Sequence, residues 1–195
     1  MSRPNTKEAI IDAAEDAVIE VGASHLTLDA VAERAGISKG GLLYHFPNKD
    51  ALLNAMLERL FADYQTRRAA VLESLPDSPG RELRAHILVG LSEDEIEKRS
   101  RSRKVASAII AAAANDPKFM GTIRQHCGGI IRRIATTDGV LDSCKLVVLL
   151  AVDGLVFWEL MGMCPLEPKE RDQAFGALLD LADRVSAKGG ARCES

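Results

Sequence analysis

Two short helical patterns lie close together near the N-terminus, separated only by the sequence Ala35-Gly36-Ile37. Thr27 and Ser38 stand directly before the two patterns, where a hydroxyl can accept a hydrogen bond from a backbone N–H of the first helical turn. Gly36 can adopt the positive φ that a tight turn requires. Two short helices joined by such a turn predict a helix-turn-helix.

The second of these helices begins with Lys39-Gly40-Gly41. Each glycine in a helix costs about 1 kcal/mol relative to alanine, so a purely structural helix seldom begins with two of them. Close approach of the backbone to base edges in a major groove explains the glycines, with Lys39 beside them as a reading side chain. A flexible loop is the alternative explanation.

The residues around this helix extend the same surface. The Tyr44 hydroxyl and the His45 imidazole can reach phosphate oxygens at the groove edge. Lys49 and Thr27 lie at the starts of their helices, where backbone N–H groups also attract phosphate. We therefore expect the DNA-binding residues to be Thr27, Ser38, Lys39, Gly40, Gly41, Tyr44, His45 and Lys49.

The whole chain is predicted to be all-α, because aromatic residues make up only 4% and no alternating strand pattern persists. The expected helices cover residues 5–21, 28–35, 39–45, 49–75, 81–97, 103–115, 117–136, 142–163 and 169–187. We expect a three-helix DNA-binding domain at 1–48, a larger ligand-binding and dimerisation domain at 49–188, and a flexible tail at 189–195.

Composition limits the function further. The net charge of −3 and the five basic against eight acidic residues in positions 1–50 argue against a sequence-independent nucleic-acid binder. Specific binding would then rest on few phosphate contacts in each subunit and would require a dimer. There is no C-x-x-C pair, no phosphate-binding glycine loop and no H-E-x-x-H motif, so we expect no metal, no cofactor and no catalytic residues.

Taken together, the motif residues resemble the DNA-binding domain of the TetR family of transcriptional regulators. The resemblance covers about the first quarter of the chain and rests on the pattern Thr27-x3-Val31-Ala32-x2-Ala35-Gly36-Ile37-Ser38-Lys39-Gly40-x-Leu42-x-Tyr44-His45-Phe46-x2-Lys49-x2-Leu52. It implies an all-helical homodimer with a divergent C-terminal domain for a small-molecule effector. Leu43 departs from the family pattern, which usually has tyrosine there, so Tyr44 is expected to bear more of the contact.

The last two long helices are expected to form the dimer interface, as the family resemblance implies and their wide apolar surfaces indicate. Asp153 lies among apolar residues, so its carboxylate needs either a hydrogen bond from a neighbouring helix or a cationic ligand. The effector is expected to be apolar or cationic. The candidate effector-binding residues, each of which could instead be ordinary core, are Phe61, Tyr64, Ile110, Met120, His126, Asp153, Phe157 and Trp158.

The predicted protein is a cytoplasmic, ligand-released repressor of nearby genes, such as those for an efflux pump or a metabolic enzyme. The polar N-terminus argues against secretion, and Asp153 and Glu159 argue against a membrane span in the most apolar stretch. Two alternatives remain open: an activator, and a helical dimeric interaction protein that has lost DNA binding.

Overall fold

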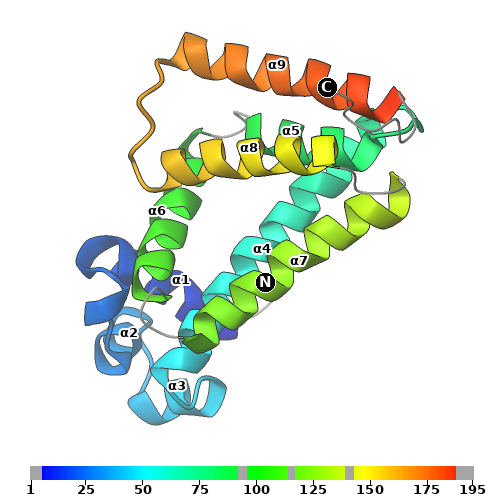
Figure 1. The fold of residues 1–195 in the computed structure, drawn as a ribbon. Coiled ribbons are helices and arrows are strands. Elements are labelled where there is room, and N and C mark those ends of the chain that lie inside the picture. The colour runs from blue at the N-terminus through cyan, green and yellow to red at the C-terminus, as the bar shows by residue number, and fades with distance from the viewer. Residues whose placement is uncertain (1–5, 92–95, 114–116, 139–142, 188–195) are drawn as a thin grey trace. The chain divides into compact units, whose positions relative to one another are not determined.

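The computed structural model describes residues 6–91, 96–113, 117–138 and 143–187, and all regular structure in these ranges is helical (Figure 1). The α-helices are α1 (Thr6–Val21), α2 (Leu28–Arg34), α3 (Lys39–His45), α4 (Lys49–Ser74), α5 (Arg81–Leu91), α6 (Ile96–Ala113), α7 (Pro117–Thr137), α8 (Ser143–Leu160) and α9 (Pro168–Ala187). A short 3-10 helix, η1 (Ala23–His25), follows α1. The all-α prediction is confirmed; the expected tail at 189–195 lies outside the described ranges.

The chain divides into two compact units. Unit 1 comprises residues 1–62 and 95–123, and unit 2 comprises residues 63–94 and 124–195. The helix α4 begins in unit 1 and ends in unit 2, so one continuous helix belongs to both. The contacts therefore group α6 with the N-terminal helices, which the chain order does not reveal.

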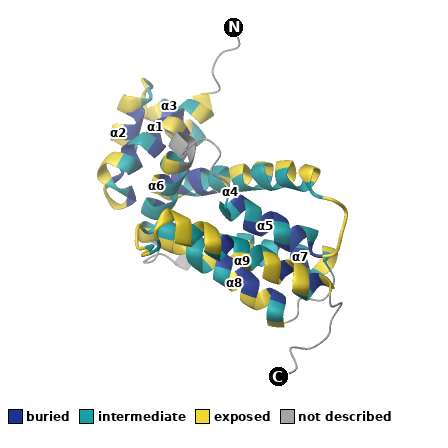
Figure 2. Ribbon diagram, turned by 90° about the horizontal axis from the view of Figure 1, so that it is seen from above, coloured by how far each residue is buried: buried dark blue, intermediate teal, exposed yellow. Residues whose placement is uncertain are grey.

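Unit 1 is held by an apolar core that α1 to α4 share with α6. Ile10, Val31, Leu42 and Leu52 are all 0% exposed, and Val105 of α6 joins the same cluster. Complete burial of such a side chain contributes roughly 1.5–3 kcal/mol. In Figure 2 these inward helix faces are coloured as buried and the outward faces as exposed.

A buried carboxylate of α1 is paired with arginines of α4 and α6. Glu15 of α1 lies 3.3 Å from Arg101 and 3.7 Å from Arg59, and Arg101 also pairs with Asp16. Burial raises the pKa of Glu15, whereas the charges of the two arginines act to lower it. The predicted end of one helix at 97 and the predicted start of the next at 103 are wrong, because α5 ends at Leu91 and α6 begins at Ile96. α6 thus includes Arg101, whose charge pairs with Glu15 and Asp16 of α1.

Unit 2 has its own core between α5, α7, α8 and α9. Leu83, Ile134, Leu149 and Phe175 are each at most 1% exposed. Gly80, at the start of α5, has φ +82°, and a Cβ atom built on it would lie 2.1 Å from Ser186 Oγ of α9. The approach of α9 to this turn therefore depends on the absence of a side chain at Gly80.

Substituting this glycine tests that packing. Gly80→Ala should lower the free energy of unfolding by more than about 2 kcal/mol, because positive-φ strain is added to a collision with Ser186. Gly162→Ala is the matched control, since Gly162 also has a positive φ (+66°) but open space around it. Urea denaturation should show a clearly smaller loss for the control; equal losses would contradict the packing argument.

Candidate DNA interface and effector site

The turn between α2 and α3 is fixed by caps and by backbone bonds. Thr27 Oγ1 accepts a hydrogen bond from Ala30 N at 3.2 Å, and Ser38 Oγ accepts one from Gly41 N at 3.1 Å. Gly36 has φ +67°, which closes the turn, and Ile37 N donates to Ala32 O at 3.0 Å. Each such cap contributes about 1 kcal/mol, so the two hydroxyls hold the geometry of the motif as well as lining it.

The outward face of α3 is open. Lys39 and Gly40 are exposed, and Tyr44 is 85% exposed, an unusual position for an aromatic ring in the free protein. A Cβ atom at Gly40 would meet nothing within 4 Å, so the backbone of α3 is bare at this point. The opposite face carries Leu42, which is completely buried. α3 thus presents lysine, glycine and tyrosine outward from a fixed base.

The remaining predicted DNA-binding residues lie on the same motif. His45 is half-buried and packs edge-on against the Tyr44 ring, with 5.2 Å between ring centroids. Lys49 Nζ donates to Ser24 O at 2.8 Å. Lys39 Nζ lies 2.9 Å from Asp29 Oδ1, so its charge is paired within the motif. A nucleic-acid phosphate or base would have to displace or share these contacts.

The eight predicted effector residues are divided between the two units. Phe61, Ile110 and Met120 belong to unit 1, where Phe61 packs against the apolar core and Met120 is 39% exposed. Tyr64, His126, Asp153, Phe157 and Trp158 belong to unit 2. For Phe61 the contacts favour ordinary core packing.

Within unit 2 a polar chain crosses from α4 to α8 through a residue that the sequence analysis missed. Tyr64 Oη lies 2.7 Å from Nδ1 of His86, and His86 Nε2 lies 2.8 Å from Asp153 Oδ1. With the imidazole proton on Nε2, the phenol donates to His86 and His86 donates to the carboxylate. His86 lies three residues after Leu83 in α5, so both side chains lie on the inner face of this helix. This spacing is the sequence pattern from which His86 could have been predicted as a site residue.

Asp153 is half-exposed and takes its hydrogen bond from α5. Of the two partners expected for this carboxylate, a donor on a neighbouring helix or a cationic ligand, the structure shows the donor on a neighbouring helix. Burial raises the pKa of Tyr64 to about 12, although the charges of Arg133 and Arg68 act in the opposite direction. The Tyr64 phenol therefore stays protonated and serves as a donor at neutral pH.

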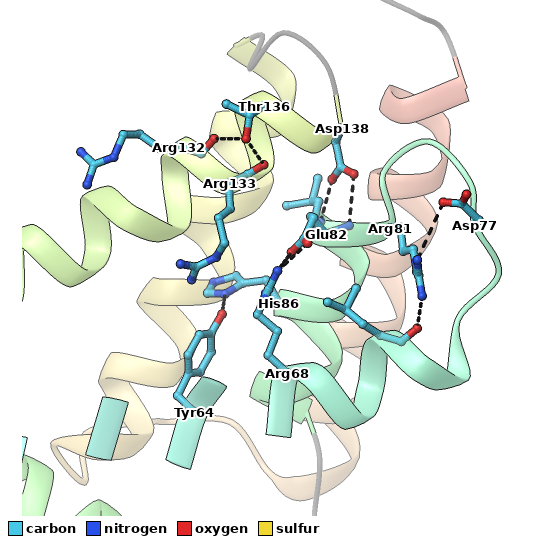
Figure 3. A network of polar contacts seen from close by, with 12 residues as sticks. Tyr64, Arg68, Asp77, Arg81, Glu82, His86, Arg132, Arg133, Thr136 and Asp138 are labelled. Carbon is cyan, nitrogen blue, oxygen red and sulfur yellow. Dashed lines mark hydrogen bonds and ion pairs between the residues drawn. The ribbon is translucent and has the colours of Figure 1, made fainter. Parts of the chain in front are cut away.

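An ion pair and a carboxylate bound to backbone N–H groups flank this chain. Arg68 of α4 binds Glu82 of α5 through two nitrogens, with Nε 2.9 Å from Oε2. Asp138, at the end of α7, accepts hydrogen bonds from the backbone N–H groups of Glu82 and Leu83 at the start of α5. Figure 3 shows these groups together with Tyr64, His86 and the guanidinium of Arg133. Arg68, Glu82, His86 and Arg133 were all absent from the predicted site.

The helix-turn-helix and the helices that follow it in the sequence match a known family. The family model for bacterial regulatory proteins of the tetR family matches residues 10–56, and the model for the tetracyclin repressor-like C-terminal domain matches residues 80–183. The second match alone covers more than half of the chain. The chain belongs to the TetR family of bacterial regulatory proteins, a family of DNA-binding transcriptional regulators and not of enzymes.

Curated relatives match over part of their length. The HTH-type transcriptional regulator BetI of Klebsiella pneumoniae (strain 342) is 30% identical over 115 residues, which is 59% of this chain and 58% of that protein. BetI of Escherichia coli (strain K12 / DH10B) is 30% identical over 111 residues, 57% of this chain and 56% of that protein. The chain thus spans little more than half the length of these relatives.

Solved structures share the fold over nearly the whole chain. A TetR-family regulator from Rhodococcus sp. has a TM-score of 0.72 at 23% identity and covers 93% of this chain and 98% of its own. The multidrug binding protein EbrR, solved with imidazole, has a TM-score of 0.63 at 22% identity and covers 92% and 96%.

Within residues 6–91, 96–113, 117–138 and 143–187, no helix is long and apolar enough to cross a membrane. No group of three or more His, Cys, Asp or Glu side chains in the same ranges could hold a metal ion.

The Tyr64 environment predicts an alkaline loss of stability. A phenol whose pKa is about 12 in the folded protein but about 10 in the unfolded chain adds stability that is complete below pH 10 and lost as the pH rises toward 12. The expected loss is on the order of 2 kcal/mol. Urea denaturation between these pH values should show a shallower decline for Tyr64→Phe; parallel declines would contradict the buried phenol.

Proposed function

We propose that the protein is a ligand-released repressor that binds operator DNA as a homodimer in the cytoplasm and controls nearby genes, such as those for an efflux pump or a metabolic enzyme. The observation that carries this proposal is the outward face of α3, where Lys39, bare Gly40 and the 85% exposed Tyr44 stand on a completely buried Leu42. The outward face of α3 is exposed and the opposite face is held in the core, which suits insertion of α3 into a major groove.

We assign the contacts by position. We place Lys39, Gly40 and Gly41 against base edges, because they form the first turn of α3. The two glycines have no side chains, so the Lys39 ammonium can donate to a base without obstruction. Thr27, Ser38, Tyr44, His45 and Lys49 bind phosphate oxygens, which fixes the register of α3 but carries no sequence information. Lys39 would exchange its partner Asp29 for a base edge on binding.

The dimer is proposed to form through α8 and α9. Val147 and Leu150 are 60% and 59% exposed, and Phe157 and Trp158 are 44% and 45% exposed. These four residues and Gly154 lie on one face of α8. A Cβ atom on Gly154 would meet nothing within 4 Å, so this face is uncovered at that point. Leu181 of α9 adds 39% exposed apolar surface. Phe157 and Trp158 are thereby proposed as interface residues as well as effector candidates.

The effector is proposed to bind in unit 2, around Tyr64, His126 and Asp153. The fold shared with the multidrug binding protein EbrR, solved with imidazole, supports a small-molecule site in the C-terminal helices. Because α4 carries Tyr64 in unit 2 and continues to Lys49 in unit 1, movement of this helix offers a route from effector to DNA. An effector that prefers the shifted α4 would change the half-site spacing and release the operator.

The glycine at the centre of the proposed interface provides the test. Gly40→Ala should raise the free energy of unfolding by about 0.5–1 kcal/mol, because alanine favours the helix. It should nevertheless weaken binding to a fragment selected from the source genome by roughly tenfold, because a methyl group obstructs the approach to base edges. Fluorescence anisotropy at fixed salt measures the affinity.

Gly121→Ala in α7 is the matched control. Gly121 is also helical with open space around it, so alanine should stabilise the protein equally and leave DNA affinity unchanged. Unchanged affinity in Gly40→Ala would place the interface elsewhere. If the wild-type protein binds no duplex at low salt, the interaction-protein alternative is correct. A reporter gene downstream of the selected fragment separates repressor from activator.

A charge on the apolar face of α8 tests the dimer. Leu150→Lys should produce monomers in sedimentation at micromolar concentration, because a buried unpaired ammonium is costly at an interface. Val21→Lys is the control, since Val21 is 51% exposed but lies at the end of α1. A Leu150→Lys protein that sediments like the wild type would remove α8 from the interface.

A further inference from the structure

Arg133 of α7 has two buried nitrogens without an acceptor. Its Nε and Nη2 atoms are inaccessible to solvent and make no hydrogen bond within the described part of the chain. Thr136 bonds only to backbone carbonyl oxygens of Arg132 and Arg133, so it does not serve the guanidinium. In Figure 3 the guanidinium lies beside the His86 ring, and no dashed line reaches it. Unpaired buried donors on a charged group are rare, because their desolvation is uncompensated.

The unpaired atoms form one edge of the guanidinium. Nε–H and one Nη2–H point in parallel, which is the geometry that binds both oxygens of a carboxylate. The neighbouring Arg68 uses this same pair of nitrogens on Glu82, with Nε bound to Oε2 and Nη2 to Oε1. In Arg68 this edge of the guanidinium binds a carboxylate, whereas in Arg133 the same edge has none.

No described residue of unit 2 supplies that carboxylate. Glu82 is bound by Arg68, and Asp153 accepts a hydrogen bond from His86. Arg81 also has an unpaired Nε, but its Nη atoms bind Leu72 O and Asp77. Among the described arginines, Arg133 alone leaves both nitrogens of one edge buried and unpaired.

The unpaired edge of Arg133 suits a ligand with one negative charge. In Figure 3 the Arg133 guanidinium points toward the Tyr64–His86 pair, and its charge acts to lower the pKa of the Tyr64 phenol. Ile130, one turn earlier on α7, packs against the core cluster that contains Ile134 and Val152. One unpaired cationic edge, on a helix that also packs against the apolar core, matches one carboxylate on an apolar body better than a doubly charged phosphate.

We propose that the effector is an organic monocarboxylate whose two oxygens bind Nε and Nη2 of Arg133, beside Tyr64 and His86. This inference rests on the proposed function and assigns its effector a charge opposite to the cationic class that Asp153 suggested. Asp153 instead orients His86 through their hydrogen bond.

The test compares ligands that differ only in the head group. Thermal unfolding and calorimetry of the full chain are measured with benzoate and decanoate, with benzamide and decanamide, with benzylamine, and with phenyl phosphate. Benzoate or decanoate should raise the Tm at millimolar concentration, and the amides, the amine and the phosphate should not. If no carboxylate raises the Tm, or if the amides or benzylamine bind as tightly, the proposal is overturned.

Variants then locate the binding. Arg133→Gln should weaken carboxylate binding about 30-fold, the effect of removing one partner of a buried charged pair. Arg132→Gln is the matched control, because Arg132 is exposed on the same helix and should keep the affinity. Carboxylate affinity in Arg133→Gln equal to that of the control contradicts the assignment. If Arg133→Gln does not fold, the head-group comparison on the wild type still decides.

A crystal structure grown with the binding carboxylate provides the last check. The expected result is the carboxylate on Arg133; an edge occupied by water alone, or by a carboxylate of a second copy of the chain, overturns the proposal. DNA binding by the same protein separates the two hypotheses. Binding to DNA without carboxylate selectivity rejects only the effector class, whereas absence of DNA binding rejects the proposed function.

Discussion

The complete burial of Leu42 and Val31 in the core of unit 1 is the interaction on which the proposed interface depends. α3 has seven residues, too few for a stable isolated helix, so packing and the Ser38 cap must hold it in place. Because Leu42 faces inward, Gly40 and Tyr44 must face outward. The same apolar contact therefore fixes the helix and determines which of its residues are available to DNA.

Each unit also contains a buried carboxylate that is paired with arginine. Glu15 lies between Arg59 and Arg101 in unit 1, and Glu82 binds Arg68 in unit 2. Removing one partner from a buried pair such as Arg68–Glu82 typically costs about 3–5 kcal/mol, because the other charge is left buried. Arg133 departs from this rule, since Nε and Nη2 of its guanidinium are buried but have no acceptor in the described part of the chain. An exception of this kind is more readily explained by binding than by stability.

The polar chain from Tyr64 through His86 to Asp153 connects these observations to regulation. It joins α4, α5 and α8 by two hydrogen bonds, and α4 is the helix that continues toward the DNA-binding motif. A ligand that binds beside Tyr64 and His86 would alter the hydrogen bonds that position α4. The free energy available to such a switch is limited by the difference in ligand affinity between the two positions of α4.

The sequence by itself determined the all-α class, the helix-turn-helix with its Thr27 and Ser38 caps, and the family, because caps, turns and helical periodicity are local signals. It also provided the outward and inward sides of α3. Only the tertiary structure grouped α6 with unit 1, moved its start to Ile96, and brought His86 and Arg133 to Tyr64. These features depend on contacts between residues far apart in the chain. No local pattern records whether a buried charge such as Arg133 finds its partner.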